Sequence, residues 1–163
     1  MLFRSVERIG AVARVLGDHG IRFGMEYCAT PSLRIGKHHE FIHSLPQLRE
    51  LIAAIGAPNL GLVLDSWHWW MSGSPSDELA ALRREEIVSL DLDDAPAGVP
   101  QKLLGDRHRE LPGTTGVIDL ERFVGTIRQL GYDGPVRAEP FEFPSLGLTR
   151  SEEHTSELQS QST

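Results

Sequence analysis

The sequence has a single cysteine, Cys28, among its 163 residues. One thiol cannot form an intramolecular disulfide, and it supplies no Cys-x-x-Cys pair for a zinc site. This cysteine content is typical of proteins from reducing compartments, and we therefore predict a cytoplasmic location.

Basic residues and long apolar runs are also scarce. Lys and Arg total 16 against 23 Asp and Glu, a formal net charge of −7, so no basic surface indicates a nucleic-acid partner. No apolar run approaches the roughly 20 residues that cross a membrane. The first residues lack the apolar stretch of a signal peptide, because Arg4, Arg8 and Arg14 interrupt it. We therefore predict a soluble protein with neither nucleic-acid nor membrane partners.

Apolar periodicity divides the chain into alternating helices and strands. It predicts helices near residues 6–16, 45–55, 76–82 and 119–130, and strands near residues 21–27, 60–64, 87–92 and 135–138. Strands that alternate with helices in this way predict a parallel α/β architecture. No glycine-rich dinucleotide or P-loop motif follows any of the strands, so a nucleotide-binding fold lacks its fingerprint.

The predicted helix at 45–55 has the clearest terminal signals. Ser44 and Gln47 have the spacing of a capping box, and Pro46 suits the first turn. Gly56 follows the last apolar position, where a glycine commonly ends a helix.

Each predicted strand ends in, or runs into, an acidic residue. These are Glu26, Asp65, Asp91 with Asp93 and Asp94 after it, and Glu139. In parallel α/β folds the carboxyl ends of the strands form the active-site face, so these carboxylates would meet there. Any one of them is equally well explained as a helix cap or a turn residue. Four at equivalent places favour a common site for a hard cation such as Mg²⁺ or Mn²⁺.

Four motifs, in order along the chain, resemble the xylose isomerase-like family of sugar phosphate isomerases and epimerases. They are LDSWHWW at 64–70, LDDAP at 92–96, RELPGTTGVID at 109–119 and GYDGPVRAEPF at 131–141. The segment Met25-Glu26-Tyr27 resembles the first metal-binding strand of the family less distinctively. The resemblance covers about residues 20–143 and implies a (β/α)8 TIM barrel.

The length of the chain sets an expectation for how much of that barrel is present. A complete barrel takes roughly 250 residues, so we expect residues 1–149 to form the C-terminal half, with about four strands and four helices. Residues 150–163 are unlike the rest; their first part, RSEEHTSELQS, resembles the translation of a sequencing-library adapter, and we interpret this segment as a non-native tail. A half-barrel exposes two sheet edges unless a second copy covers them, so an inactive fragment and a homo-oligomer are both open alternatives.

The resemblance implies one divalent metal ion, with Mn, Mg and Co as candidates. Its ligands would be Glu26, Asp65, Asp91 and Glu139. Asp91 departs from the family pattern, which usually has His or Gln at that place. One more carboxylate would over-neutralise a dication, so Asp91 is the ligand that the pattern supports least.

The resemblance also implies proton transfer next to the carbonyl of a sugar or sugar phosphate, through a cis-enediolate. Glu26 and Glu139 would act as base and acid. His68 would lie near the substrate oxygens, and Arg109 would hold a substrate hydroxyl or carboxylate. Isomerases and epimerases share this chemistry, and an inosose dehydratase-type lyase is the alternative, since it needs only a leaving hydroxyl after proton removal. A DNA-repair endonuclease on the same barrel would need further His ligands and a basic groove, which the sequence lacks.

Overall fold

The computed structural model describes residues 2–36 and 42–141. Its elements are α1 (Leu2–Asp18), β1 (Phe23–Met25), α2 (Pro31–Arg34), α3 (Leu45–Ile55), β2 (Leu60–Asp65), α4 (Ser66–Ser72), α5 (Ser76–Ala80), η1 (Arg84–Glu86), β3 (Ile87–Leu92), η2 (Gln101–Leu103), η3 (Asp106–His108), α6 (Leu120–Gln129) and β4 (Val136–Ala138), where η marks a 3₁₀ turn. The segment 150–163 lies outside the described residues, so its interpretation as a tail stays a prediction. In the described part of the chain, no helix is long and apolar enough to cross a membrane.

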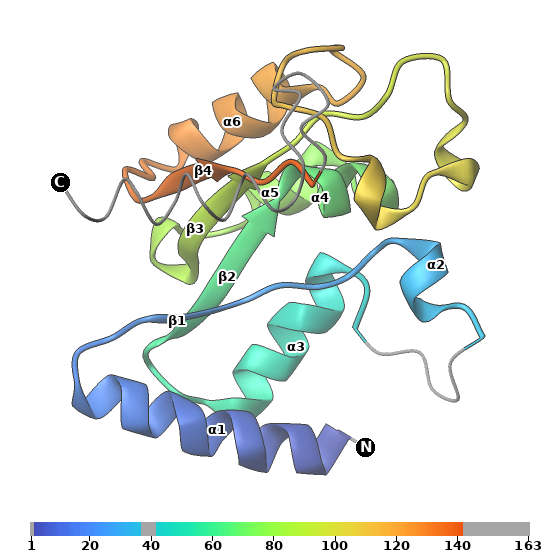
Figure 1. Ribbon diagram of the computed structural model, residues 1–163. Coiled ribbons are helices and arrows are strands. Elements are labelled where there is room, and N and C mark those ends of the chain that lie inside the picture. Colours follow the sequence, from blue (N-terminus) through green and yellow to red (C-terminus); the bar gives the residue numbers. More distant parts are fainter. Residues whose placement is uncertain (1, 37–41, 142–163) are drawn as a thin grey trace, which may run out of the picture.

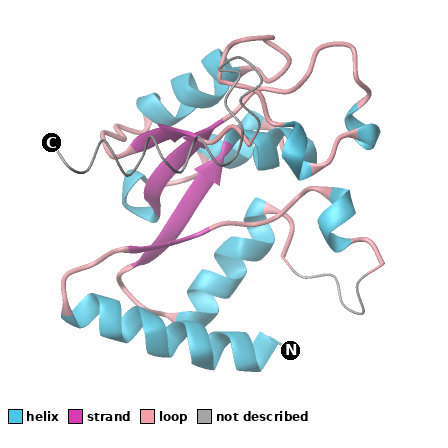
Figure 2. Cartoon of the chain, viewed as in Figure 1, coloured by secondary structure: helices cyan, strands magenta, loops and turns pink. Residues whose placement is uncertain are grey.

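The four strands form one parallel sheet in the order β1-β2-β3-β4. Helices α1 and α3 lie together along the β1–β2 half of the sheet, and α6 lies along the β3–β4 half (Figure 1). Figure 2 shows the same alternation of strands and helices, with the longest loop between β3 and α6. This arrangement confirms the predicted parallel α/β architecture.

The core explains why β2 is almost continuously apolar. Leu62 and Leu64 of β2 are buried, and they belong to one cluster with Leu90 of β3 and with Phe123 and Ile127 of α6. A strand in the middle of a parallel sheet is covered on both faces, so it has no solvent side that would favour polar residues.

The start of α3 differs from the predicted capping box. Ser44 is the N-cap residue, but its side chain makes no cap hydrogen bond. An N-cap hydroxyl accepts from the second or third helical N–H; Pro46 lacks the N–H at the second position, while Gln47 keeps the one at the third. Gln47 Oε1 instead accepts from the backbone N–H of His43 at 3.0 Å. The predicted end is confirmed, because Gly56 has a φ of 68° and its N–H donates to the Ile52 carbonyl.

Asp94 ties together the two ends of the long loop that follows β3. Its buried carboxylate accepts backbone N–H bonds of 2.7–3.0 Å from four residues: Ala95, Thr115, Gly116 and Ile118. Its backbone also pairs with Glu110, in an isolated antiparallel bridge. Burial alone would raise the pKa of Asp94, but the backbone hydrogen bonds outweigh it and lower the pKa. Asp94 therefore faces the loop and fixes its path. The sequence alone did not distinguish Asp94 from Asp93, the other acid that follows Asp91.

We predict that D94A lowers the free energy of unfolding by about 3 kcal/mol, because several buried N–H groups lose a charged acceptor. D94N retains one carbonyl oxygen and should lower it less. Chemical denaturation followed by far-UV circular dichroism measures both changes. D133A removes an exposed carboxylate from a turn and serves as the control; equal losses in D94A and D133A would contradict the role given to Asp94.

Candidate active site

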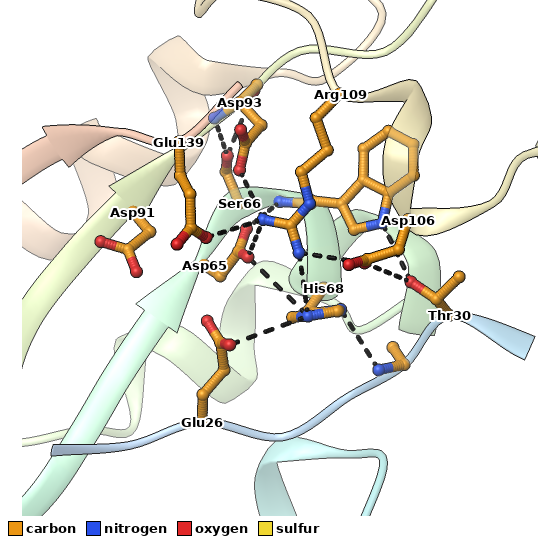
Figure 3. A network of polar contacts seen from close by, with 12 residues as sticks. Glu26, Thr30, Asp65, Ser66, His68, Asp91, Asp93, Asp106, Arg109 and Glu139 are labelled. Atoms are coloured by element: carbon orange, nitrogen blue, oxygen red, sulfur yellow. Dashed lines mark hydrogen bonds and ion pairs between the residues drawn. The ribbon is translucent and has the colours of Figure 1, made fainter. Parts of the chain in front are cut away.

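Acidic and basic side chains from all four strands and from the long loop meet at the carboxyl ends of the strands (Figure 3). The predicted residues Glu26, Asp65, His68, Asp91, Arg109 and Glu139 are all among them, together with Asp93 and Asp106. The structure therefore brings together every residue for which the sequence predicted a role.

Strand register explains why the carboxylates converge. Asp65 of β2 pairs with Asp91 of β3, which pairs in turn with Arg137 of β4. Residues in register lie side by side and point to the same face of a sheet, and alternation along β4 returns that direction at Glu139. Glu26 directly follows β1, so each of the four strands delivers one carboxylate.

Arg109 lies at the centre of the site. Its Nη1 donates to Asp65 Oδ2 at 2.6 Å, to Asp93 Oδ2 at 3.0 Å and to Glu139 Oε2 at 3.0 Å, and its Nη2 donates to Asp106 Oδ1 at 3.0 Å. The residue is only 3% exposed. Burial would lower the pKa of Arg109, but the surrounding carboxylates outweigh it and raise the pKa further. Arg109 is therefore a permanent cation that balances several buried negative charges.

Aromatic rings flank this guanidinium. The Cζ atom of Arg109 lies 5.8 Å from the ring centroid of Trp67 and 4.7 Å from that of Phe141. The indole N–H of Trp67 donates to the Thr30 hydroxyl, which donates to Asp106. Trp67 thus orients the charged centre from a fully buried position, as a wall of the site.

Asp65 is both a helix cap and a site residue. Its Oδ1 accepts the backbone N–H of Trp67 at 2.7 Å and so caps α4, while its Oδ2 accepts from Arg109. From the sequence, a helix cap and a site carboxylate were alternative predictions for Asp65, and α4 was not predicted. An acid at the N-cap position, Asp65 directly before SWHWW, was the available signal for this short helix.

His68 lies on α4 between donors and acceptors. Its Nδ1 is 3.3 Å from the backbone N of Ala29, and its Nε2 is 3.2 Å from Arg109 Nη2, 3.8 Å from Asp65 Oδ2 and 3.9 Å from Glu26 Oε2. Desolvation, with Arg109 adding to it, lowers the pKa of His68 against the opposing effect of Asp65. Because the pKa is lowered from an ordinary value that is already below 7, the ring is neutral at pH 7.

Asp93 is a site residue that the sequence analysis did not assign. It lies two residues after Asp91 and is fully buried, and its Oδ1 has no hydrogen-bond partner among the described residues. The Ser66 hydroxyl fixes its backbone by accepting the Asp93 N–H at 2.8 Å. Removal from water, followed by repulsion from Asp65, raises the pKa of Asp93 to about 8. The two-residue spacing from Asp91 was the sequence signal for this position.

The donor set fits a divalent cation. Three groups have ligand atoms within 4.8 Å of one another: Glu26 with Asp65 and His68, Glu26 with Asp91 and Glu139, and Asp65 with Asp93 and Glu139. Carboxylate oxygens and a neutral imidazole are ligands for such ions, and the unpartnered Asp93 Oδ1 adds a buried donor. Arg109 already bonds to all three members of the third group. The space around Glu26, which the first two groups share, suits a cation better.

Curated relatives of the chain are enzymes. An inosose isomerase from Halalkalibacterium halodurans is 28% identical over 130 residues, which cover 80% of this chain and 43% of that protein. A ketose 3-epimerase from Arthrobacter globiformis is 32% identical, over 86% of this chain and 42% of that protein. A 3-dehydroshikimate dehydratase from Pseudomonas putida is 32% identical, over 78% of this chain and 20% of that protein. The chain therefore spans half the length of these relatives or less.

Solved structures show the same fold. A xylose isomerase domain protein from Alicyclobacillus acidocaldarius superimposes with a TM-score of 0.79 at 33% identity, over 99% of this chain and 58% of that chain. The IOLI protein, solved with a zinc atom, superimposes with a TM-score of 0.76 at 24% identity, over 98% of this chain and 54% of that chain. The sequence profile of the xylose isomerase-like TIM barrel family matches residues 2–160. The four-stranded parallel sheet and this match together show that the chain belongs to the xylose isomerase-like TIM barrel family.

Proposed function

We propose that the chain carries the metal site of an enzyme that transfers a proton next to the carbonyl of a sugar, a sugar phosphate or a related small molecule. The observation that carries the proposal is the convergence of Glu26, Asp65 and Glu139 at the ends of three different strands, where each pair of them belongs to a group whose ligand atoms lie within 4.8 Å of one another. The names of the relatives, an inosose isomerase and a ketose 3-epimerase, support this class of substrate. The single cysteine and the lack of a basic surface support a cytoplasmic location and a small-molecule partner.

The proposed metal ligands are Glu26, Asp65 and Glu139, with Asp91 as the fourth. Mn²⁺, Mg²⁺ and Co²⁺ suit these oxygen donors, and the zinc atom of the IOLI structure adds Zn²⁺ to the candidates. A bound dication would polarise the carbonyl and the neighbouring hydroxyl of the substrate.

Glu26 and Glu139 are the proposed base and acid. Desolvation, followed by repulsion from Asp65, raises the pKa of Glu26 to about 8, so that this group can exchange a proton near neutral pH. Burial likewise raises the pKa of Glu139, although Arg109 opposes the shift. Removal of a proton by one carboxylate and its return by the other, on the neighbouring carbon or the opposite face, gives isomerisation or epimerisation through an enediolate.

His68 and Arg109 are the proposed substrate contacts. The neutral His68 can donate to or accept from a hydroxyl close to Glu26. Arg109 Nε has no hydrogen-bond partner among the described residues, although it is buried. A substrate oxygen can bond to it only after the side chains that cover it move.

Dehydration is the second candidate reaction. The 32% identity to a 3-dehydroshikimate dehydratase favours it, and the same proton removal leads to it when a hydroxyl leaves from the next carbon. Incubation of inososes, ketoses and 3-dehydroshikimate with the metal-loaded protein in D₂O separates the two reactions. Deuterium in an isomeric product indicates isomerisation or epimerisation, whereas a product lighter by one water indicates dehydration. No deuterium incorporation and no water loss with any of these substrates would contradict the proposed chemistry.

We predict that E139Q and D65N each lower the affinity for Mn²⁺ by about tenfold or more, because each removes a charged oxygen donor. All the proposed ligands lie within this chain, so isothermal titration with MnCl₂ can be performed on the chain itself. E121Q, which changes an exposed glutamate on α6, is the matched control. Unchanged Mn²⁺ binding in E139Q would sink the site assignment.

We also predict that Mn²⁺ affinity rises between pH 6 and pH 8, by at most about tenfold per pH unit for each proton released. Below its pKa of about 8, Glu26 holds a proton that the metal must displace. The free energy of unfolding of the metal-free chain has the opposite pH dependence. Because the pKa of Glu26 is higher in the folded state than in the unfolded state, this free energy declines as the pH rises toward 8. Titrations in buffers of different ionisation enthalpy count the released protons, and a pH-independent affinity would refute the shift.

A further inference from the structure

Arg137, on β4, binds the carboxylate of Asp91 through both of its oxygens. Nε lies 2.6 Å from Asp91 Oδ1, and Nη2 lies 2.7 Å from Asp91 Oδ2. We infer that Arg137 is a positioning residue of the metal site: it neutralises Asp91, weakens it as a ligand, and so sets the affinity of the site for its cation. The inference rests on the proposed metal site and deepens it.

The pairing of β3 with β4 places these two residues together. Asp91 and Arg137 are partners in the parallel register, with Leu90 opposite Val136 on one side and Leu92 opposite Ala138 on the other. Their side chains therefore point to the same face at the same level. No loop has to adopt a special conformation, so the contact belongs to the sheet itself.

Only the carboxylate side of the pair is buried. Asp91 is 1% exposed, and a buried carboxylate without a partner is costly, whereas the Arg137 side chain is 63% exposed. The planar fork of an arginine matches the two carboxylate oxygens, which gives the shortest and most directional kind of ion pair. Side-chain hydrogen bonding to Asp91 is also the leading cause of the raised pKa of Arg137. One acceptor site on each Asp91 oxygen is thereby used by a guanidinium N–H group.

The charge around the site shows what this pairing changes. Glu26, Asp65, Asp91 and Glu139 would bring four negative charges to a dication. Arg109 bonds to Asp65 and Glu139 but makes no contact with Asp91 among its described hydrogen bonds. Arg137 bonds to Asp91 and stays 3.7 Å from Glu139 Oε1. The two arginines thus divide the carboxylates between them, and Arg137 takes the one that would otherwise add an uncompensated charge.

Metal affinity in a mutant cycle tests the inference. Without Arg137, Asp91 becomes a free anionic ligand, so R137M should tighten Mn²⁺ binding by about tenfold, equivalent to about 1.4 kcal/mol. D91N alone should change the affinity by less than about threefold, or about 0.7 kcal/mol. The double variant R137M/D91N should resemble D91N, because the gain requires the Asp91 carboxylate. R49M breaks a surface ion pair with Glu86 and removes the same charge away from the site, so it is the control.

A merely structural role for Arg137 gives a different pattern. It would lower the melting temperature of R137M in EDTA and leave the Mn²⁺ affinity of the folded fraction unchanged or weaker, and that result overturns the inference. A loss of more than about tenfold in D91N also overturns it, since Asp91 would then be a principal ligand. R137K provides a second variant if R137M does not fold, because it keeps the positive charge but loses the two parallel N–H bonds to Asp91. R137K should tighten Mn²⁺ binding by less than tenfold, but by more than R49M does.

The same titrations separate this inference from the proposed function. Absence of Mn²⁺ binding in the unaltered chain, or unchanged binding in E139Q, contradicts the metal site itself. Binding that is lost in E139Q but not tightened in R137M or R137K leaves the metal site standing and removes only the role of Arg137.

Discussion

The guanidinium of Arg109 lies in a region that excludes water, bonded to Asp65, Asp93 and Glu139. Carboxylates brought this close together repel one another, and each loses its hydration, so a fold that assembles them needs an internal cation. Arg109 provides that charge whether or not a metal ion is bound. Burial is the main cause of the lowered pKa of His68, and the positive charge of Arg109 adds to it.

The position of Arg109 depends in turn on the long loop between β3 and α6. Asp94 holds both ends of that loop by accepting backbone N–H groups, and Asp106 and Trp67 orient the arginine from two sides. Asp65, which also bonds to Arg109, has a structural role as well, because it caps α4. The stability of the loop and the electrostatics of the site are therefore coupled: the carboxylate of Asp94 holds the loop that carries Arg109, and the carboxylate of Asp65 bonds to Arg109 itself.

The sequence predicted those features that depend on local patterns. Apolar runs located the strands, and the acid at each strand end, with His68 and Arg109 from the family motifs, supplied side chains that meet in the structure. The role of Arg137 depends on the pairing of β3 with β4, and that of Asp93 depends on its bond to Arg109, 16 residues later in the chain, so neither could be read from a local pattern. The predicted capping box was wrong, because Ser44 is the N-cap residue but its side chain makes no cap hydrogen bond. Pairings between distant segments leave no periodic trace in a single sequence.

The consecutive parallel order of the four strands has a consequence for how such a chain can change over generations. Side chains on a strand alternate between the two faces, so deleting one residue inside β4 would turn Glu139 away from the site. Each strand contributes its own acid, and a length change in any of them would remove one donor and leave the others in place. Insertions and deletions should therefore accumulate in the loops at the carboxyl ends, where they reshape the mouth of the site around an unaltered ring of acids.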